Sequence, residues 1–211
     1  DGTIPSTVNV NTANGFSIVK YTGTGSNLTV GHGLSSAPDF VIVKNLTSSS
    51  AWAVFHTTLG ATKYLALNES TAVATASNVW NDTAPTATTI SVGTWGPVNT
   101  SANEHIAYCF HDVTGYSKFG TYTGNGSTQS ITGVGFQPDF IMFKKTSATQ
   151  DWLMVDSVRG GQKELVPNSN AAEYTMSNGV SSFDSDGWSM GANNSLNTNS
   201  ETYIYMAFKI N

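Results

Sequence analysis

Charged residues are scarce in this chain of 211 residues. Asp, Glu, Lys and Arg make up 11% of it, against about 25% in an ordinary soluble domain. Because nucleic-acid binding needs a basic face, the net charge of −5 argues against a nucleic-acid-binding protein. Ser, Thr, Asn and Gly take the place of the charges, while hydrophobic residues at 39% still supply a core.

Cysteine and long apolar runs are nearly absent as well. A single cysteine, Cys109, excludes an internal disulfide framework and a cysteine-rich zinc site. It lies in an apolar run, so we expect a buried thiol. No apolar run approaches the roughly 20 residues of a membrane span, so we expect no membrane insertion. The chain begins at Asp1 without a leader, which indicates a processed product or an excerpt of a longer protein.

What the chain does contain is an internal repeat. Three pairs of segments match: Tyr21–Ser26 with Tyr122–Ser127, Pro38–Phe40 with Pro138–Phe140, and His105–Phe110 with Tyr203–Phe208. We interpret the chain as a duplication, with an N-terminal lead-in segment (1–14), a first repeat (15–112) and a second repeat (115–211). The joint Val113-Thr114 is too short for a flexible linker, so the repeats are expected to pack together.

Each repeat has the pattern of β structure. The runs Phe40–Val43 and Phe140–Phe143 are continuously apolar, which is typical of strands covered on both faces. Short strands alternate with Gly, Asn and Ser, as in sandwiches and jelly rolls. No stretch has convincing helical periodicity, although Ala171–Met176 allows one turn. We predict an all-β fold of two tandem, homologous antiparallel β-sandwich or jelly-roll-like repeats.

The carboxylates give little support to catalysis. Asp39 and Asp139 occupy the same place in the two repeats, which favours a structural role at a turn over a glycosidase pair. The segment Asp184–Gly187 resembles part of a calcium loop but lacks the closing Glu, which favours a plain turn. We therefore expect no catalytic residue, no metal site and no cofactor, and we do not expect an enzyme.

The repeat sorts the tryptophans into two groups. Trp52 and Trp152 match each other, and Trp188 aligns with the apolar Ile90, so we expect all three in the core. Positions shared by both copies serve the fold, whereas a position held by one copy is free to serve a partner.

Trp95 belongs to the second group. It lies in a turn-rich loop near Asn99 and Asn103, and an exposed indole beside amides suits stacking on a sugar ring. A Trp folded back over its own loop is the alternative. Trp80 lies at a strand end and allows either role. The sequence-predicted ligand-binding residues are Trp95, Asn99, Asn103 and Trp80, with a glycan as the ligand.

Several segments of the repeat resemble a known family. They are Gly115–Gly126, Pro138–Phe140 and Tyr203–Phe208, together with their counterparts in the first repeat. They resemble a duplicated β module common in predicted tail and virion proteins of marine bacteriophages, over residues 15–211. The resemblance implies an extracellular virion setting and supplies no catalytic residues.

These observations predict a bacteriophage virion protein, namely a tail fibre or spike domain that contacts host surface glycans. The expected partners are a host surface glycan, other virion proteins and further copies of the chain, in a homo-oligomer such as a trimer. A structural decoration or spacer domain without a ligand is the alternative. A polysaccharide depolymerase is a third interpretation, which requires two carboxylates about 5–10 Å apart in a groove.

Overall fold

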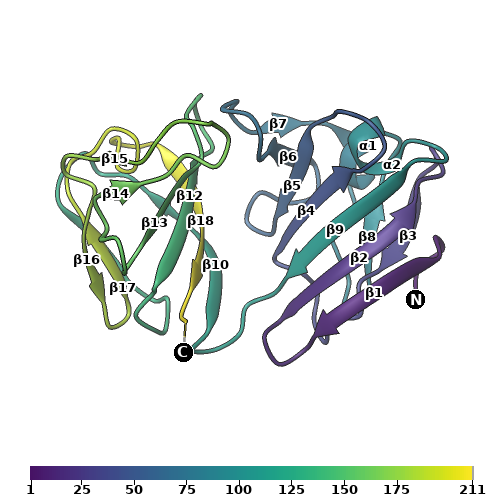
Figure 1. Cartoon of the computed structure of the whole chain (residues 1–211), viewed down its shortest axis with the longest axis horizontal. Helices are drawn as coiled ribbons and strands as arrows, with labels where there is room; N and C mark the ends of the chain where they lie inside the picture. The colour runs from purple at the N-terminus through teal and green to yellow at the C-terminus, as the bar shows by residue number, and fades with distance from the viewer. Residues whose placement is uncertain (211) are drawn as a thin grey trace. The chain divides into compact units, whose positions relative to one another are not determined.

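The computed structural model describes residues 1–210 and is almost entirely β (Figure 1). The predicted all-β fold with antiparallel sheets is confirmed. The chain divides into two compact units. Unit 1 comprises residues 1–67 and 73–112, and unit 2 comprises residues 68–72 and the chain from Val113 onward.

Unit 1 is built on one large antiparallel sheet. Its strands in spatial order are β1 (Ser6–Asn11), β2 (Phe16–Thr22), β9 (Glu104–Phe110), β4 (Phe40–Asn45), β5 (Trp52–His56), β6 (Lys63–Ala66) and β7 (Ala74–Thr75). A second pair of strands consists of β3 (Leu28–Gly31) and β8 (Thr89–Val92). The strand β1 lies within the predicted lead-in segment and pairs with β2 along its whole length.

Unit 2 contains three smaller sheets. The first has the order β10 (Ser117–Thr123), β18 (Thr202–Phe208), β12 (Phe140–Lys145) and β13 (Leu153–Asp156). The second has the order β11 (Gln129–Ile131), β17 (Gly187–Met190) and β16 (Val180–Asp184), and the third pairs β14 (Lys163–Glu164) with β15 (Tyr174–Thr175).

The same strand arrangement occurs in both units. The order β2-β9-β4-β5 in unit 1 corresponds to β10-β18-β12-β13 in unit 2. The registers correspond too, because Phe40 lies opposite Phe110 and Phe140 lies opposite Phe208. Among residues 113–210, no strand takes the place of β1 beside β10.

Each unit has its own hydrophobic core, formed by every second residue of its strands. In unit 1 the core includes Val19 on β2, Val41 on β4 and Cys109 on β9. In unit 2 it includes Phe143 and Trp188. The predicted burial of Cys109 is confirmed, and burial raises the pKa of its thiol to about 12, so it is not a nucleophile at neutral pH.

Two one-turn helices lie in unit 1, where the sequence predicted none. They are α1 (Ser77–Trp80) and α2 (Gly96–Asn99). Neither is long enough to show a helical period. Pro97 in the first turn favours α2 because its missing N–H has no partner there in any case. The suggested turn at Ala171–Met176 is wrong, since β15 occupies that segment.

The prediction of three core tryptophans needs one correction. Trp152 and Trp188 are fully buried, but Trp52 is half-exposed. Its ring lies 5.9 Å from Lys44 Nζ, on the face of the sheet that points away from the unit 1 core. The matched positions differ in place as well as in cover, because Trp52 is the first residue of β5 whereas Trp152 lies just before β13.

Candidate functional site

Asn99 lies in the interior of unit 1 and closes a turn. Its side chain is 0% exposed. The backbone N–H of Thr24 donates to Asn99 Oδ1 at 2.8 Å, and Asn99 Nδ2 donates to the carbonyls of Ser26 at 2.6 Å and Gly93 at 2.8 Å. Every polar atom of the amide is thus engaged with the backbone, so the assignment of Asn99 to a glycan surface is corrected.

Trp80 is also part of the interior. It is 2% exposed and meets Phe55 edge to face, with ring centroids 6.0 Å apart. It ends α1, which turns back at Asn81 in the left-handed conformation with φ 51°. This placement buries the indole and leaves it no surface for a ligand, so Trp80 is likewise removed from the predicted site.

Trp95 stays at the surface and has an aromatic neighbour that the sequence did not indicate. It immediately precedes α2, and its ring centroid lies 4.8 Å from that of Tyr64 on β6, with the rings tilted by 54°. Both side chains are half-exposed and pack on the edge of the unit 1 core. The backbone N–H of Trp95 donates to Asn78 O at 2.9 Å, which fixes the loop.

Asn103 is connected to the loop of Trp95 by a chain of two hydrogen bonds through Asn45. Its Nδ2 donates to Asn45 Oδ1 at 3.3 Å, and Asn45 Nδ2 donates in turn to the carbonyl of Gly96, next to Trp95, at 3.4 Å. Asn103 is thus linked through Asn45 to the backbone of the residue after Trp95, whereas Tyr64 contacts the Trp95 ring directly. We call Tyr64, Trp95 and Asn103 the α2 rim.

The α2 rim carries no charge of its own. The buried residue beneath it is His105, whose Nε2 lies 3.3 Å from Gly96 O. Burial lowers the pKa of His105, and its contacts with the carbonyls of Gly96 and Asn103 only partly oppose this. His105 is therefore neutral at pH 7, and the rim is an aromatic and amide surface suited to an uncharged ligand.

In unit 2 an acid occupies the position of Tyr64. Glu164 on β14 is 0% exposed, and the hydroxyl of Tyr174 donates to its Oε1 through a short hydrogen bond. Its Oε2 has no hydrogen-bond partner. Burial raises the pKa of Glu164 to about 7, which is the range of a general acid. With no exposed surface, however, this carboxyl does not reach a substrate.

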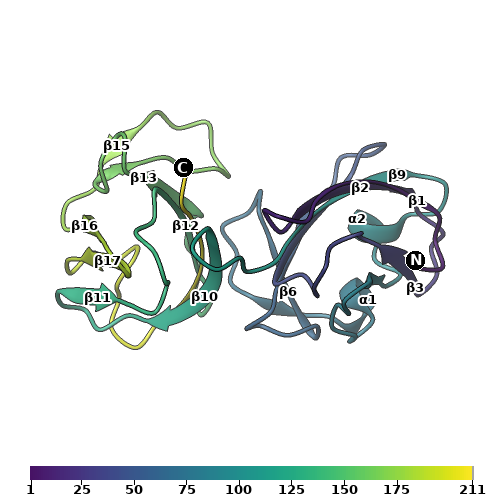
Figure 2. The same cartoon turned by 90° about the horizontal axis from the view of Figure 1, so that it is seen from below.

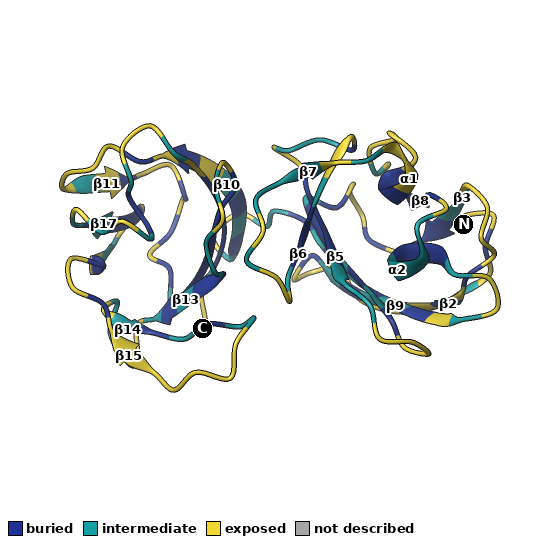
Figure 3. Ribbon diagram, turned by 90° about the horizontal axis from the view of Figure 1, so that it is seen from above, coloured by how far each residue is buried: buried dark blue, intermediate teal, exposed yellow. Residues whose placement is uncertain are grey.

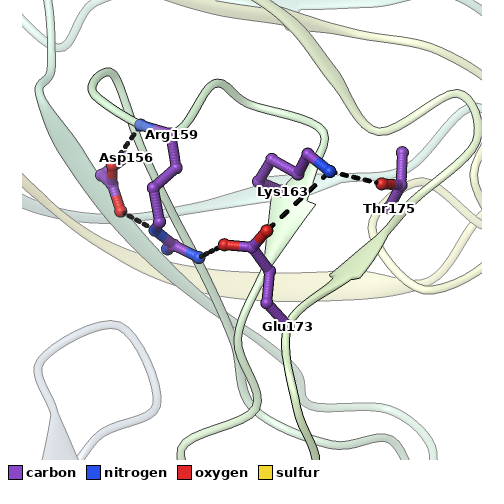
Figure 4. A network of polar contacts seen from close by, with 5 residues as sticks. All are labelled: Asp156, Arg159, Lys163, Glu173 and Thr175. Carbon is purple, nitrogen blue, oxygen red and sulfur yellow. Dashed lines mark hydrogen bonds and ion pairs between the residues drawn. The ribbon is translucent and has the colours of Figure 1, made fainter.

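A charged network next to Glu164 was missed at the sequence level (Figure 4). Arg159 Nε lies 2.6 Å from Asp156 Oδ2, and Arg159 Nη1 lies 3.1 Å from Glu173 Oε2. Lys163 Nζ lies 3.8 Å from Glu173 Oε1 and donates to Thr175 Oγ1 at 2.9 Å. Burial acts to raise the pKa of Asp156, but the hydrogen bonds and charge of Arg159 outweigh it and lower that pKa. The network fastens β14 and β15 to the end of β13.

The repeat-matched aspartates hold the backbone at the same place in each unit. Asp39 Oδ2 accepts the backbone N–H of Asp112 at 2.8 Å, and Asp139 Oδ2 accepts that of Ile210 at 2.8 Å. These contacts support the predicted structural role. Asp186 lies in the turn between β16 and β17 and accepts the backbone N–H groups of Gly133 and Gly135, which lower its pKa and hold the loop after β11 against this turn. Among residues 1–210, no three His, Cys, Asp or Glu side chains converge as metal ligands.

Comparison with known proteins gives one family. A family model described as "Domain of unknown function (DUF7483)" matches residues 1–211. No curated protein and no solved structure matches the chain. Within residues 1–210, the helices are all too short to cross a membrane.

Proposed function

The chain belongs to the DUF7483 family of domains of unknown function, and we propose that it is a virion surface domain that contacts host glycans through the α2 rim. The observation that carries this proposal is the pair Trp95 and Tyr64, half-exposed and 4.8 Å apart at the edge of unit 1. An aromatic face offers the apolar C–H groups of a sugar ring a large contact at little entropic cost. Asn103 supplies an amide next to it.

The surroundings of the rim favour a neutral, hydroxyl-rich ligand. Charged residues make up 11% of the chain, and the side chains of the α2 rim are themselves uncharged residue types. A charged ligand would need compensating charges at the site, whereas a sugar needs a ring to stack on and a few directed hydrogen bonds. Unit 2 has no such pair at the matching position, since Glu164 replaces Tyr64 there.

The virion setting rests on the sequence. Residues 15–211 resemble a module of marine bacteriophage tail and virion proteins, and the low-charge, Ser/Thr/Asn-rich composition suits an extracellular particle. We propose a tail fibre or spike domain, with other virion proteins and further copies of the chain as neighbours. A spacer domain without a ligand is the competing function, and the packing of Trp95 on the unit 1 core is the observation that favours it.

A polysaccharide depolymerase has weaker support. The carboxyl with a pKa near 7, that of Glu164, is enclosed by its own unit. A glycosidase needs its acid within hydrogen-bond reach of the glycosidic oxygen. Asp39 and Asp139 each bind the backbone of their own unit.

A glycan array probed with the intact chain tests the proposal. We expect binding to host-surface polysaccharides that Trp95→Ala reduces at least tenfold and that Trp95→Phe largely retains. Trp52→Ala is the matched control, because Trp52 is also half-exposed but lies on the opposite face of the sheet. Binding that falls equally in Trp95→Ala and Trp52→Ala would contradict a site at the α2 rim, and no binding to any host polysaccharide would favour the spacer.

A further inference from the structure

A serine and a histidine that are far apart in the sequence meet at one end of the large sheet of unit 1. Ser35 Oγ lies 3.5 Å from His111 Nε2, and 76 positions separate the two residues. Ser35 lies in the loop 32–39, which leads from β3 to β4, and His111 directly follows β9. Figure 2 shows β3 on the concave side of the sheet, so this loop runs from the second layer of the unit back to the sheet. The sequence did not indicate the pair, because only the fold brings its members together.

The surroundings of His111 fix which ring nitrogen carries the proton. Its Nδ1 lies 2.8 Å from the backbone carbonyl oxygen of Asp112, which can only accept a hydrogen bond. Nδ1 is therefore the protonated nitrogen of the neutral ring, and the bare Nε2 accepts from the Ser35 hydroxyl. The backbone N–H of Asp112 donates in turn to Asp39 Oδ2 at 2.8 Å, which holds Asp112 in place. A hydroxyl, a base and a group that orients the base are the parts that activate a serine.

A second histidine near this pair stays uncharged. His32 is 0% exposed, its Nδ1 accepts the backbone N–H of Leu34 at 3.1 Å, and its Nε2 lies 3.2 Å from Thr86 O. Burial lowers the pKa of His32, the carbonyl of Thr86 only partly opposes this, and a positive charge on His111 lowers it further. His32 is therefore neutral at pH 7, so a proton that is transferred to His111 meets no positive charge there.

The loop does not need the contact between Ser35 and His111 to keep its course. Its first residue, His32, and its last, Asp39, donate their backbone N–H groups to carbonyl oxygens at 3.3 Å and 2.7 Å. Leu34 belongs to the core, which lies between the sheet and the helices α1 and α2 (Figure 3). Ser35 itself is exposed. Its hydroxyl is therefore accessible from solvent while it lies against the imidazole.

The pair occurs in only one of the two repeats. The alignment of the repeats puts Gly135 in the place of Ser35 and Lys209 in the place of His111, whereas the supporting aspartate is present in both. Positions shared by both copies serve the fold. A pair held by one copy is free to serve a reaction.

We propose that Ser35 and His111 hydrolyse short-chain carboxylic esters of hydroxyl-rich alcohols, an activity that does not depend on the α2 rim. Ser35 Oγ attacks the carbonyl carbon of the ester while His111 Nε2 takes the hydroxyl proton, and this proton passes to the leaving alcohol as the ester C–O bond breaks. Water then attacks the acyl group on Ser35 and gives a proton to Nε2. That proton returns to Ser35 Oγ as the carboxylic acid leaves. The distance of 3.5 Å is long, but such contacts often shorten only when substrate binds.

The backbone after Ser35 offers donors for the oxyanion that forms during the attack. Among residues 1–210, the backbone N–H groups of Ser36 and Ala37 have no hydrogen-bond partner in the chain. The N–H of the residue after a nucleophilic serine is a common oxyanion donor. We therefore assign this role to Ser36 N–H.

The surroundings of Ser35 favour a small polar ester. A long acyl chain needs an enclosed apolar pocket, whereas Ser35 is exposed. An open cavity of about 400 Å³ is lined by Gly33, two residues before Ser35, and by the hydroxyl-bearing Thr3 and Ser6, among others. Hydroxyl groups and backbone at its wall suit an alcohol that is itself rich in hydroxyl groups.

Hydrolysis of p-nitrophenyl acetate by the intact chain tests this proposal. We expect turnover that Ser35→Ala and His111→Gln each reduce at least about a hundredfold. Ser35→Ala removes only an exposed hydroxyl, so this variant keeps the fold. Thr58→Ala is the matched control, because Thr58 Oγ1 lies 3.0 Å from another histidine nitrogen of unit 1, His56 Nδ1. That nitrogen already accepts the backbone N–H of Thr58, so Thr58→Ala should hydrolyse the ester like the wild type.

Labelling with a fluorophosphonate gives a second readout. An activated serine forms an Oγ–P bond as fluoride leaves, and mass spectrometry should place this adduct on Ser35 in the wild type and find none in His111→Gln. Three results would overturn the proposal: wild-type hydrolysis no faster than that of Ser35→Ala, a Thr58→Ala variant as slow as Ser35→Ala, or an adduct on a residue other than Ser35. The ester carries no sugar, so its hydrolysis and the binding of glycans are tested independently.

Discussion

Asn99 and Asn197 form equivalent hydrogen bonds in the two units. Each side-chain oxygen accepts a backbone N–H from the glycine-rich turn after the first long strand of its unit, at 2.8 Å in both units. Each side-chain nitrogen donates to two carbonyls: Asn99 to Ser26 and Gly93, and Asn197 to Ser127 and Gly191. Each buried asparagine thus fastens, by hydrogen bonds, the turn that the Thr-Gly-X-Gly-Ser motif forms in its unit. We call each of these asparagines a turn clamp.

Loss of either clamp should destabilise its unit. Asn99→Ala and Asn197→Ala each remove the partner of one partly buried N–H and of two carbonyls, so we expect a loss of about 2–4 kcal/mol in the free energy of unfolding. Urea denaturation followed by circular dichroism measures it. Asn103→Ala, at a half-exposed position, should lose less than about 1 kcal/mol. Equal losses for Asn99→Ala and Asn103→Ala would contradict the claim that the buried hydrogen bonds of Asn99 stabilise unit 1.

The matched tryptophans should differ in their contribution to stability. Trp152 is 1% exposed, so Trp152→Ala should cost about 3–5 kcal/mol through the cavity that it leaves. Trp52 is half-exposed beside Lys44, and Trp52→Ala should cost about 1–2 kcal/mol. Equilibrium unfolding of the two variants checks this order. The reverse order would show that burial is assigned to the wrong tryptophan.

Glu164 should make the stability of unit 2 depend on pH. Burial raises its pKa from 4.5 to about 7 in the folded state. Between these values the folded chain binds more protons than the unfolded chain, so the contribution of Glu164 to stability falls as the pH rises from 4.5 to 7. Glu164→Gln removes this loss and should be more stable than the wild type at pH 8, by about 1–3 kcal/mol.

Thermal unfolding at pH 5 and pH 8 measures this effect. Glu69→Gln supplies the control for the loss of an exposed carboxylate. A Glu164→Gln variant with the same pH dependence as the wild type would mean that the acid ionises freely in the folded chain.

Arg159 should hold the β14–β15 sheet against β13. Arg159→Ala removes both of its ion pairs, at 2.6 Å to Asp156 and 3.1 Å to Glu173. Because all three side chains are partly exposed, we expect a loss of only about 0.5–1.5 kcal/mol, smaller at high salt. Hydrogen exchange should accelerate at Lys163 and Thr175 and stay unchanged in unit 1. Acceleration throughout the chain would contradict a local role.

Some features followed from the sequence because the repeat carries them. The apolar runs at Phe40 and Phe140 became β4 and β12, each an inner strand of the main sheet of its own unit. The aspartates before them bind the backbone just beyond the closing strand of each unit. The structural role of Asn99 could also have been predicted from the sequence. The closing strands match 98 positions apart, from His105 to Tyr203, and the same offset pairs Asn99 with Asn197.

Other features depend on contacts between distant strands. Tyr64 and Trp95 lie 31 positions apart in the sequence, and only the packing of α2 on the sheet brings their rings together. The half-exposure of Trp52 was likewise hidden, since the period of a strand gives the side of the sheet but not what covers it.

Nuclear magnetic resonance of the indole N–H groups tests the glycan-binding proposal most directly. The signal of Trp95 is assigned by its disappearance in Trp95→Phe, and host-surface polysaccharide is then titrated into the ¹⁵N-labelled chain. We predict that the Trp95 signal shifts with saturation, while those of the buried Trp80 and Trp188 stay in place. A titration in which the Trp95 signal does not move, or in which another indole moves alone, would contradict a glycan site at the α2 rim.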